Sequence, residues 1–228
     1  EQLADSSDPY GKAFDWLVID DGLMMAPDDP GLVQRFILAY IYFATTTNAP
    51  WNACNPSAGL DYCSSFVTAD TSLRWLSPFP ECRWAGVGPC NENGDILELD
   101  LREIGLNGKF PNGVARLSFL EFLYFSKNAL SGSIPDSLFE LPLKRLYLEE
   151  NALTGTISTA IGRLSSVDRL VLHRNSLRGS IPSSIGDLRN VTFLFLEDNF
   201  LTGPIPTTIG KLEQLQLLRF GNNELRGS

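Results

Sequence analysis

The sequence predicts an α/β solenoid, in which short stacked units share one parallel sheet. The apolar pattern L-x-x-L-x-L-x-x-N-x-L recurs five times from Leu120 onward. Its asparagines are spaced by 23, 24, 24 and 24 residues, at Asn128, Asn151, Asn175, Asn199 and Asn223. A fixed period of this length is typical of repeats that bury their apolar side chains against their neighbours. All four cysteines and all four tryptophans precede these repeats, which indicates a separate N-terminal unit.

Composition restricts the classes of function. The 228 residues carry a net charge of −9, and residues 1–30 alone hold eight acids against one lysine. The sequence has no basic patch of the kind that binds nucleic acid. No apolar run reaches the 18 or so residues that span a bilayer. We expect an acidic, solvated leader in residues 1–27, a cap in residues 28–95, and about five and a half repeats of 23–24 residues in residues 96–228.

The segment before the repeats has the pattern of a helical cap. Asp28, Asp29 and Pro30 precede apolar residues at steps of three and four, beginning at Leu32. An acidic N-cap, a proline in the first turn and this spacing predict an amphipathic helix. Its expected role is to cover the apolar edge of the first repeat. We expect the four tryptophans to pack in the core of this cap, and a ligand cage is the alternative.

The cysteines favour disulfide bonds. Their spacings do not match the paired cysteines of zinc sites, and an even number within one segment favours two bridges. Three connectivities are open, and sequential pairing, Cys54–Cys63 and Cys82–Cys90, is the one we prefer. Disulfides persist in oxidising compartments, so secretion is expected. Four reduced cysteines in a cytosolic protein are the alternative.

Each repeat combines a strand with a turn and a return path. Within L-x-L the two leucines point into the core, and the neighbouring residues point outward. The asparagine follows the strand, where its carboxamide can both donate to and accept from backbone groups of the turn. We therefore expect the five asparagines to form a structural ladder. The glycine permits a positive φ and the proline restricts φ, so "GxIP" predicts a return path without a long helix.

The outward positions are the ones that vary, and they form three columns. The first two columns are rich in aromatic residues and arginines, and the third holds mostly polar and charged residues, including Glu149, His173 and Glu197. Aromatic and arginine side chains dominate binding hot spots, whereas cross-strand stacking is the structural alternative. The candidate ligand-binding residues are Phe122, Tyr124, Arg145, Tyr147, Arg169, Val171, Phe193 and Phe195.

The fuller pattern, LxxLxLxxNxLxGxIPxxIGxL, resembles the plant-type leucine-rich repeat family. Residues 167–188 and 191–212 match it most fully, and "CRWAGVGPC", which spans Cys82 to Cys90, resembles the family's N-terminal cap. Leucine-rich repeat proteins of algae and diatoms carry similar caps. The resemblance covers residues 30–228. It implies a right-handed superhelix, a secreted or cell-surface location and binding through the solenoid. Many members are ectodomains of receptor-like kinases or receptor-like proteins, and others are soluble inhibitors of wall-degrading enzymes.

The expected function is therefore binding of a protein or peptide by a receptor-like ectodomain, through the outward columns on the concave face of its parallel sheet. A soluble secreted binder and a structural subunit of a larger assembly remain open. No nucleophile or metal motif accompanies His173, so we expect no enzymatic activity, cofactor or metal. Asn190-Val191-Thr192 is a glycosylation sequon. We also expect further repeats or a partner to cover the C-terminal edge, and any membrane contact to come from a span beyond residue 228.

Overall fold

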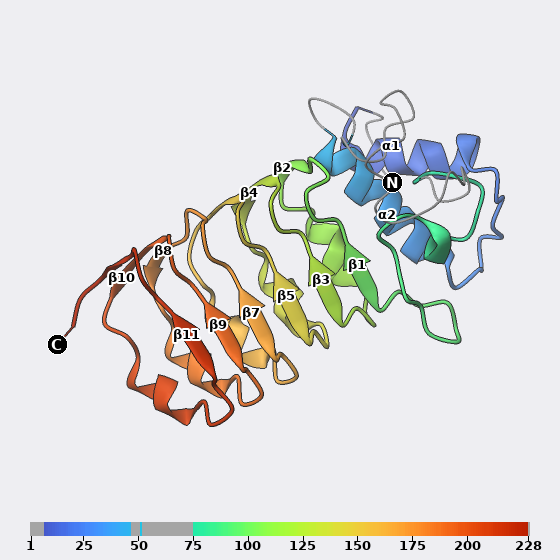
Figure 1. Ribbon diagram of the computed structural model, residues 1–228. Coiled ribbons are helices and arrows are strands. Elements are labelled where there is room, and N and C mark those ends of the chain that lie inside the picture. Colours follow the sequence, from blue (N-terminus) through green and yellow to red (C-terminus); the bar gives the residue numbers. More distant parts are fainter. Residues whose placement is uncertain (1–6, 47–50, 52–74, 228) are drawn as a thin grey trace.

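The computed structural model describes residues 7–46, 51 and 75–227, and it forms a curved solenoid (Figure 1). A helical cap occupies one end, and the repeats extend from it toward the C-terminus. Cys54 and Cys63, which are predicted to form a bridge, lie outside the described residues. Among the residues that are described, none of the helices is both long and apolar enough to span a bilayer.

The predicted parallel sheet is confirmed. One strand from each repeat joins a six-stranded sheet in the order β1-β3-β5-β7-β9-β11. Equivalent residues of neighbouring repeats are aligned, as Leu146 is with Leu170. The strands are β1 (Glu98–Asp100), β3 (Phe122–Tyr124), β5 (Arg145–Tyr147), β7 (Arg169–Val171), β9 (Phe193–Phe195) and β11 (Leu217–Arg219).

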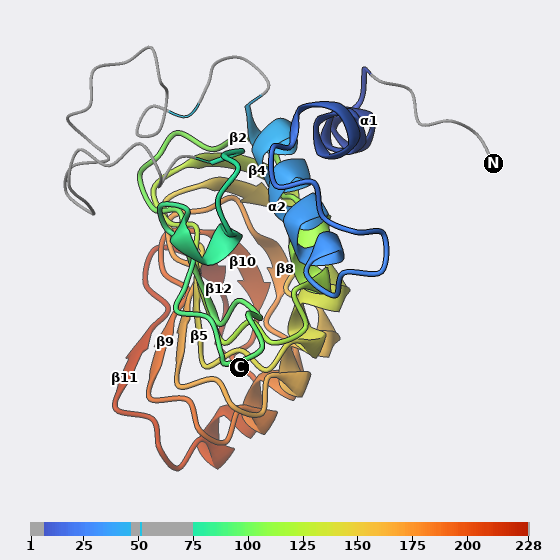
Figure 2. The ribbon, with the colours of Figure 1, turned by 90° about the vertical axis from the view of Figure 1, so that its right-hand side faces the viewer.

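The return half of each repeat contains a second short strand and a 3-10 helix. Figure 2 shows these helices stacked along the side of the solenoid opposite the large sheet. The return strands are β2 (Asn107–Lys109), β4 (Ala129–Ser133), β6 (Ala152–Thr154), β8 (Arg178–Ser180), β10 (Phe200–Gly203) and β12 (Glu224–Leu225). The 3-10 helices are η5 (Asn112–Arg116), η6 (Asp136–Glu140), η7 (Thr159–Arg163), η8 (Ser183–Asp187) and η9 (Thr207–Lys211).

Leucines fill the space between the two halves. The central leucine of strands β1, β3, β5, β7 and β9 is fully buried, and so are Leu148, Leu172 and Leu196, which follow three of these strands. Full burial of one leucine contributes roughly 1.5–3 kcal/mol, so the repeated core is the main source of stability. Leu218 of β11 is 38% exposed, because within the described chain β11 has a neighbouring strand on one side only.

The asparagine side chains connect successive repeats. Asn175 accepts from the Leu153 backbone N–H (3.0 Å) and donates to the carbonyl oxygens of Leu148 (2.9 Å) and Leu172 (3.1 Å). The other four ladder asparagines make equivalent bonds. The residue before each asparagine adopts a left-handed conformation, with φ between 51° and 55°. This conformation is uncommon outside glycine. It was not expected from the types of these residues, which are Lys127, Glu150, Arg174, Asp198 and Asn222.

The predicted cap helix is α2 (Leu32–Thr45), and it packs against the first repeat. Gly113 of η5 lies against the Tyr40 ring of α2, where an added Cβ would stand 2.6 Å from a ring carbon. The predicted acidic N-cap is wrong, because Gly31 occupies that position. Asp29 instead accepts from the Gly31 N–H (2.8 Å), so it closes the turn that leads into the helix.

The expected solvated leader is also wrong for its described part. Residues Pro9–Asp15 form helix α1, and Trp16–Asp20 continue it as a π-helical turn, η1. Asp8 caps α1 by accepting from Gly11 (2.7 Å). Tyr10 stacks on Tyr40 of α2 with ring centroids 4.2 Å apart. Helix α1 therefore forms an outer layer on α2 (Figure 2).

A buried arginine joins this leader to the rest of the cap. The fully buried guanidinium of Arg35 donates to both Asp21 carboxylate oxygens, at 2.6 and 2.5 Å. It also donates to the carbonyl oxygens of Ser77 (2.7 Å) and Phe79 (3.0 Å). Its central carbon lies about 5 Å from the rings of two tryptophans, Trp16 and Trp84. Buried charges require partners of this kind, so Asp21 is structural.

The remaining cap predictions are confirmed where the structure describes them. The four tryptophans are buried and in contact, with ring centroids 4.6 to 6.1 Å apart. Cys82 and Cys90 form a disulfide, as the sequential pairing requires. The bridge closes the loop that leads into the first strand.

Candidate functional site

The eight candidate binding residues all lie on the outward face of the six-stranded sheet. They occupy the first or third position of strands β3, β5, β7 and β9, on either side of the buried leucine. The register aligns them into two columns across the strands. Six of them are half-buried, whereas Tyr124 (8% exposed) and Val171 (5% exposed) are more covered than we expected.

The side chains of this face pack against one another, both across neighbouring strands and along a single strand. Tyr124 meets Tyr147 edge to face at 5.1 Å. Phe193 stacks on Phe195 at 6.0 Å, and the Arg169 guanidinium lies 4.8 Å from the Phe193 ring centre. Such aromatic pairs contribute about 0.5–1.5 kcal/mol each. Side-chain stacking therefore explains part of the aromatic content of this face, because these residues stabilise the sheet even without a ligand.

Two arginines in the first column face each other across neighbouring strands. Arg145 and Arg169 are direct partners in the register, and like charges in this position are unfavourable. Arg145 lies 3.6 Å from Asp168. Arg169 reaches the Tyr147 hydroxyl at 3.4 Å, and no described carboxylate lies within ion-pair distance of it. The Nε atoms of both arginines are buried and, among the described residues, without a hydrogen-bond partner.

A second charged cluster borders the other side of the aromatic columns. It consists of Glu149, His173 and Glu197, one from each of three successive repeats. Burial raises the pKa of the Glu149 carboxyl, although the Ser126 hydroxyl donates to it and nearby His173 lowers the pKa. One oxygen of each glutamate and Nδ1 of His173 are buried without a partner in the described chain. These residues form the third predicted outward column but are not among the predicted binding residues, although the alternation of acid, histidine and acid is visible in the sequence.

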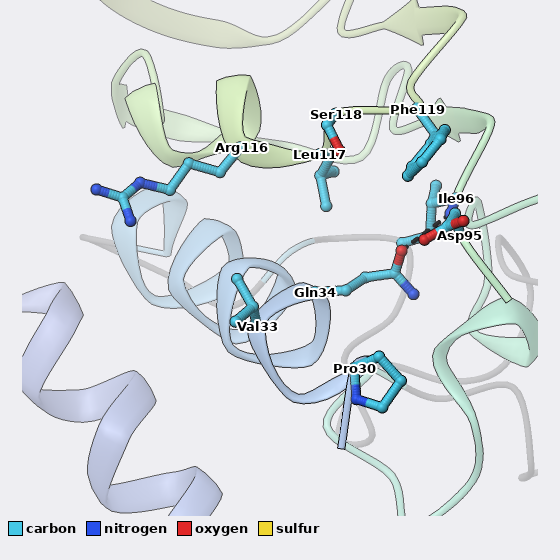
Figure 3. Close-up of a pocket in the computed structure, with 9 residues that line it drawn as sticks. All are labelled: Pro30, Val33, Gln34, Asp95, Ile96, Arg116, Leu117, Ser118 and Phe119. Carbon is cyan, nitrogen blue, oxygen red and sulfur yellow. Dashed lines mark hydrogen bonds between the residues drawn. The ribbon is translucent and has the colours of Figure 1, made fainter. Parts of the chain in front are cut away.

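A small cavity lies between α2 and the first repeat (Figure 3). Gln34 bridges its two walls by donating to the Gly94 carbonyl (3.0 Å) and accepting from the Ile96 N–H (2.9 Å). Val33 and Phe119 provide exposed apolar surface beside it. Its volume of about 140 Å³ is large enough for one small chemical group and too small for an extended ligand. No sequence pattern predicted this cavity, since its walls come from distant segments.

The predicted glycosylation residue lies away from the binding columns. Asn190 is exposed in the turn that precedes β9, and its amide donates to the Ser165 carbonyl of the previous repeat (2.7 Å). Thr192 of the same sequon donates to the Asp168 carbonyl (2.9 Å). A glycan on Asn190 would project from the edge of the sheet opposite the asparagine ladder.

Comparison with known proteins identifies the fold with the ectodomains of plant receptors. Two family models, both for leucine-rich repeats, match residues 141–201 and 119–141. The BIR2 ectodomain from Arabidopsis thaliana is 32% identical with a TM-score of 0.58, and the match covers 72% of this chain and 85% of that one. The protein is thus a receptor-like leucine-rich repeat ectodomain in its fold. The chain belongs to the plant-type leucine-rich repeat family.

Longer receptors are similar over part of their length. The ectodomain of the Arabidopsis thaliana receptor kinase GASSHO1/SCHENGEN3, in complex with CASPARIAN STRIP INTEGRITY FACTOR 2, is 35% identical with a TM-score of 0.63. That match covers 70% of this chain and 20% of the receptor chain. An inactive leucine-rich repeat receptor-like serine/threonine-protein kinase of the same plant is 34% identical over 111 residues. The chain spans 16% of that kinase and 13% of another curated relative.

Proposed function

We propose that the chain is a non-enzymatic, extracellular binding module of a receptor-like protein, and that it binds a protein or peptide on the concave sheet. The observation that carries this proposal is the aromatic face of β3, β5, β7 and β9, which is bordered by Arg145 and Arg169 on one side and by Glu149 and Glu197 on the other. Aromatic and arginine side chains are the residue types that dominate the binding energy of protein interfaces.

The comparisons support the class of ligand and the location. GASSHO1/SCHENGEN3 is described as a plant membrane receptor kinase whose structure was solved with CASPARIAN STRIP INTEGRITY FACTOR 2. The disulfide Cys82–Cys90 is consistent with an oxidising compartment. A cell-surface location and a glycan on Asn190 follow from the same proposal.

Selection of ligands from a displayed peptide library tests this function. The 228-residue chain is the bait, and selected peptides are then measured against Tyr147→Ala and Phe195→Ala. We expect each variant to weaken binding at least about tenfold, since aromatic side chains in such positions dominate affinity. Ile205→Ala is the matched control, because Ile205 is an exposed apolar residue outside the six-stranded sheet. Equal binding by all three variants would contradict the proposal that the ligand lies on the six-stranded sheet.

A further inference from the structure

We propose that β5, β7 and β9 bind an extended peptide segment whose side chains alternate in charge. Its acidic side chains lie over Arg145 and Arg169, and its basic side chains lie over Glu149 and Glu197. This inference rests on the proposed function and specifies the chemistry of the ligand.

The charges are separated across the face. Arg145 begins β5 and Glu149 stands four residues later, which in extended chain is about 13 Å. The next repeat places Arg169 and His173 in the same two positions. Between these borders lie Tyr147, Val171 and Phe195, which are uncharged. A ligand that crosses the strands over these three residues therefore has Arg145 and Arg169 on one side and Glu149 and Glu197 on the other. Asp168 beside Arg145 and Arg219 beside Glu197 reduce this separation but do not reverse it.

The polar atoms without partners are concentrated at these borders. Of nine buried side-chain atoms without a hydrogen-bond partner in the described residues, six belong to this surface. Two of these atoms, Arg145 Nε and Asp168 Oδ1, form a long ion pair with each other at 3.6 Å, and Arg219 and Glu197 form another of the same length. The charged groups of this surface are thus weakly paired with one another, and the exposed parts of their side chains remain accessible to a ligand. The six atoms are Arg145 Nε, Asp168 Oδ1, Arg169 Nε, Glu149 Oε2, His173 Nδ1 and Glu197 Oε2.

The geometry selects an extended peptide. In extended chain, successive side chains point to opposite sides, and those on one side recur about every 6.6 Å. Neighbouring strands of the sheet are about 4.8 Å apart, so two long acidic side chains can reach two arginines on adjacent strands. A ligand of one charge sign would meet attraction at one border and repulsion at the other. Alternating charge is therefore the pattern that this surface selects.

Metal binding is not favoured as an explanation of the acidic border. Within the residues that the structure describes, no three histidine, cysteine or carboxylate groups are placed to hold a metal ion. The histidine also separates the two glutamates, and the remaining border is cationic. A lysine or arginine side chain of a ligand is flexible, so it can reach these glutamates although their carboxylates are not close enough together to hold a metal ion.

Two labelled octapeptides of identical composition provide the test. One is (Glu-Lys)₄ and the other is Glu₄-Lys₄, so that net charge and residue content are the same and only the pattern differs. Binding to the 228-residue chain is measured by fluorescence anisotropy at low salt. We expect the alternating peptide to bind about tenfold more tightly than the block peptide.

Variants that remove charges show which residues cause the preference for the alternating peptide. Arg145→Gln/Arg169→Gln and Glu149→Gln/Glu197→Gln should each bring the affinity ratio of the two peptides close to one. Glu140→Gln/Arg163→Gln removes an exposed ion pair between η6 and η7, and it should leave the ratio unchanged. Thermal unfolding of each variant shows whether it is folded. If a double variant is not folded, the single variant Arg169→Gln or Glu197→Gln is measured in its place.

The outcomes separate this inference from the proposed function. Equal affinity of the wild-type chain for the two octapeptides would overturn the inference, and so would a ratio that persists in both charge-removing variants. If library-selected ligands still depend on Tyr147 and Phe195 in that case, the binding face stands and only the alternating-charge ligand is rejected.

Discussion

Asn199 shows how one side chain can hold three backbone segments. It accepts from the Leu177 N–H (3.0 Å) and donates to the carbonyl oxygens of Leu172 (3.1 Å) and Leu196 (3.2 Å). Asn199→Ala leaves these groups buried without partners, and each costs about 1–3 kcal/mol. We expect a loss of roughly 2–4 kcal/mol in the free energy of unfolding, measured by urea denaturation. Asn112→Ala, at an exposed position, is the control and should change stability by less than about 0.5 kcal/mol.

Alternation along the strand separates stability from binding. Leu196 is fully buried, so Leu196→Ala should lower the free energy of unfolding by about 2–5 kcal/mol. Phe195 is half-buried and contacts Phe193 and the Arg219 guanidinium, so Phe195→Ala should cost about 1–2 kcal/mol. The two losses are compared by chemical denaturation of both variants. Equal losses would mean that Phe195 belongs to the core.

The raised pKa of Glu149 has a defined effect on stability. Because burial favours the neutral carboxyl in the folded chain, ionisation at neutral pH lowers stability. This cost disappears as the pH falls below the folded pKa. Glu149→Gln cannot ionise, so it should be more stable than wild type at pH 7.5, and the difference should shrink toward pH 4. Unfolding curves across this range check the trend, and a difference that grows on acidification would contradict it.

Among the elements, the repeats could be predicted and part of the cap could not. Each core position recurs in every repeat, so the pattern around Leu146 is supported by equivalent positions before and after it. The contact between Arg35 and Asp21 occurs once, between segments with no common pattern, and no repetition reveals it. For the same reason α1 was missed, because its helix depends on packing against α2. The binding columns were predicted by alternation, but the unpaired atoms in them depend on side-chain positions.

The cap should depend strongly on Arg35. Arg35→Met removes the cation and leaves Asp21 buried without its partner, which typically costs about 3–5 kcal/mol. Burial also raises the pKa of Glu81, which lies 3.8 Å from Arg35. The measurement is chemical unfolding followed by tryptophan fluorescence, since the four tryptophans report on the cap. In the double variant Arg35→Met/Asp21→Asn part of the stability should return, and no recovery would contradict the ion-pair explanation.

The disulfide of the cap has a chemical test. Cys82 and Cys90 should react with an alkylating reagent only after reduction, and peptide mass mapping assigns the label to each. In the chain-entropy model, closing so short a loop contributes about 2–3 kcal/mol, so reduction should lower the stability of the cap by that amount. Labelling of both residues without reductant would contradict the oxidised state and the extracellular location that rests on it.

For the whole molecule, the exposed edge of β11 predicts association. Leu217 and Leu218 are 40% and 38% exposed, and an uncovered apolar sheet edge favours pairing. We propose that a second molecule covers this edge of the 228-residue chain. Light scattering of the 228-residue chain should show a mass that increases with concentration, and Leu218→Lys should reduce the increase. A constant monomer mass for the unchanged chain would contradict this proposal.

The central claim is that a peptide or protein ligand lies on the concave sheet of this solenoid. Site-specific photocrosslinking tests it most directly, with benzoylphenylalanine placed at position 147, 195 or 205 in turn. A library-selected ligand should crosslink from positions 147 and 195, which lie on the sheet, and give no product from position 205. Crosslinking from position 205 alone would place the ligand elsewhere and contradict the account.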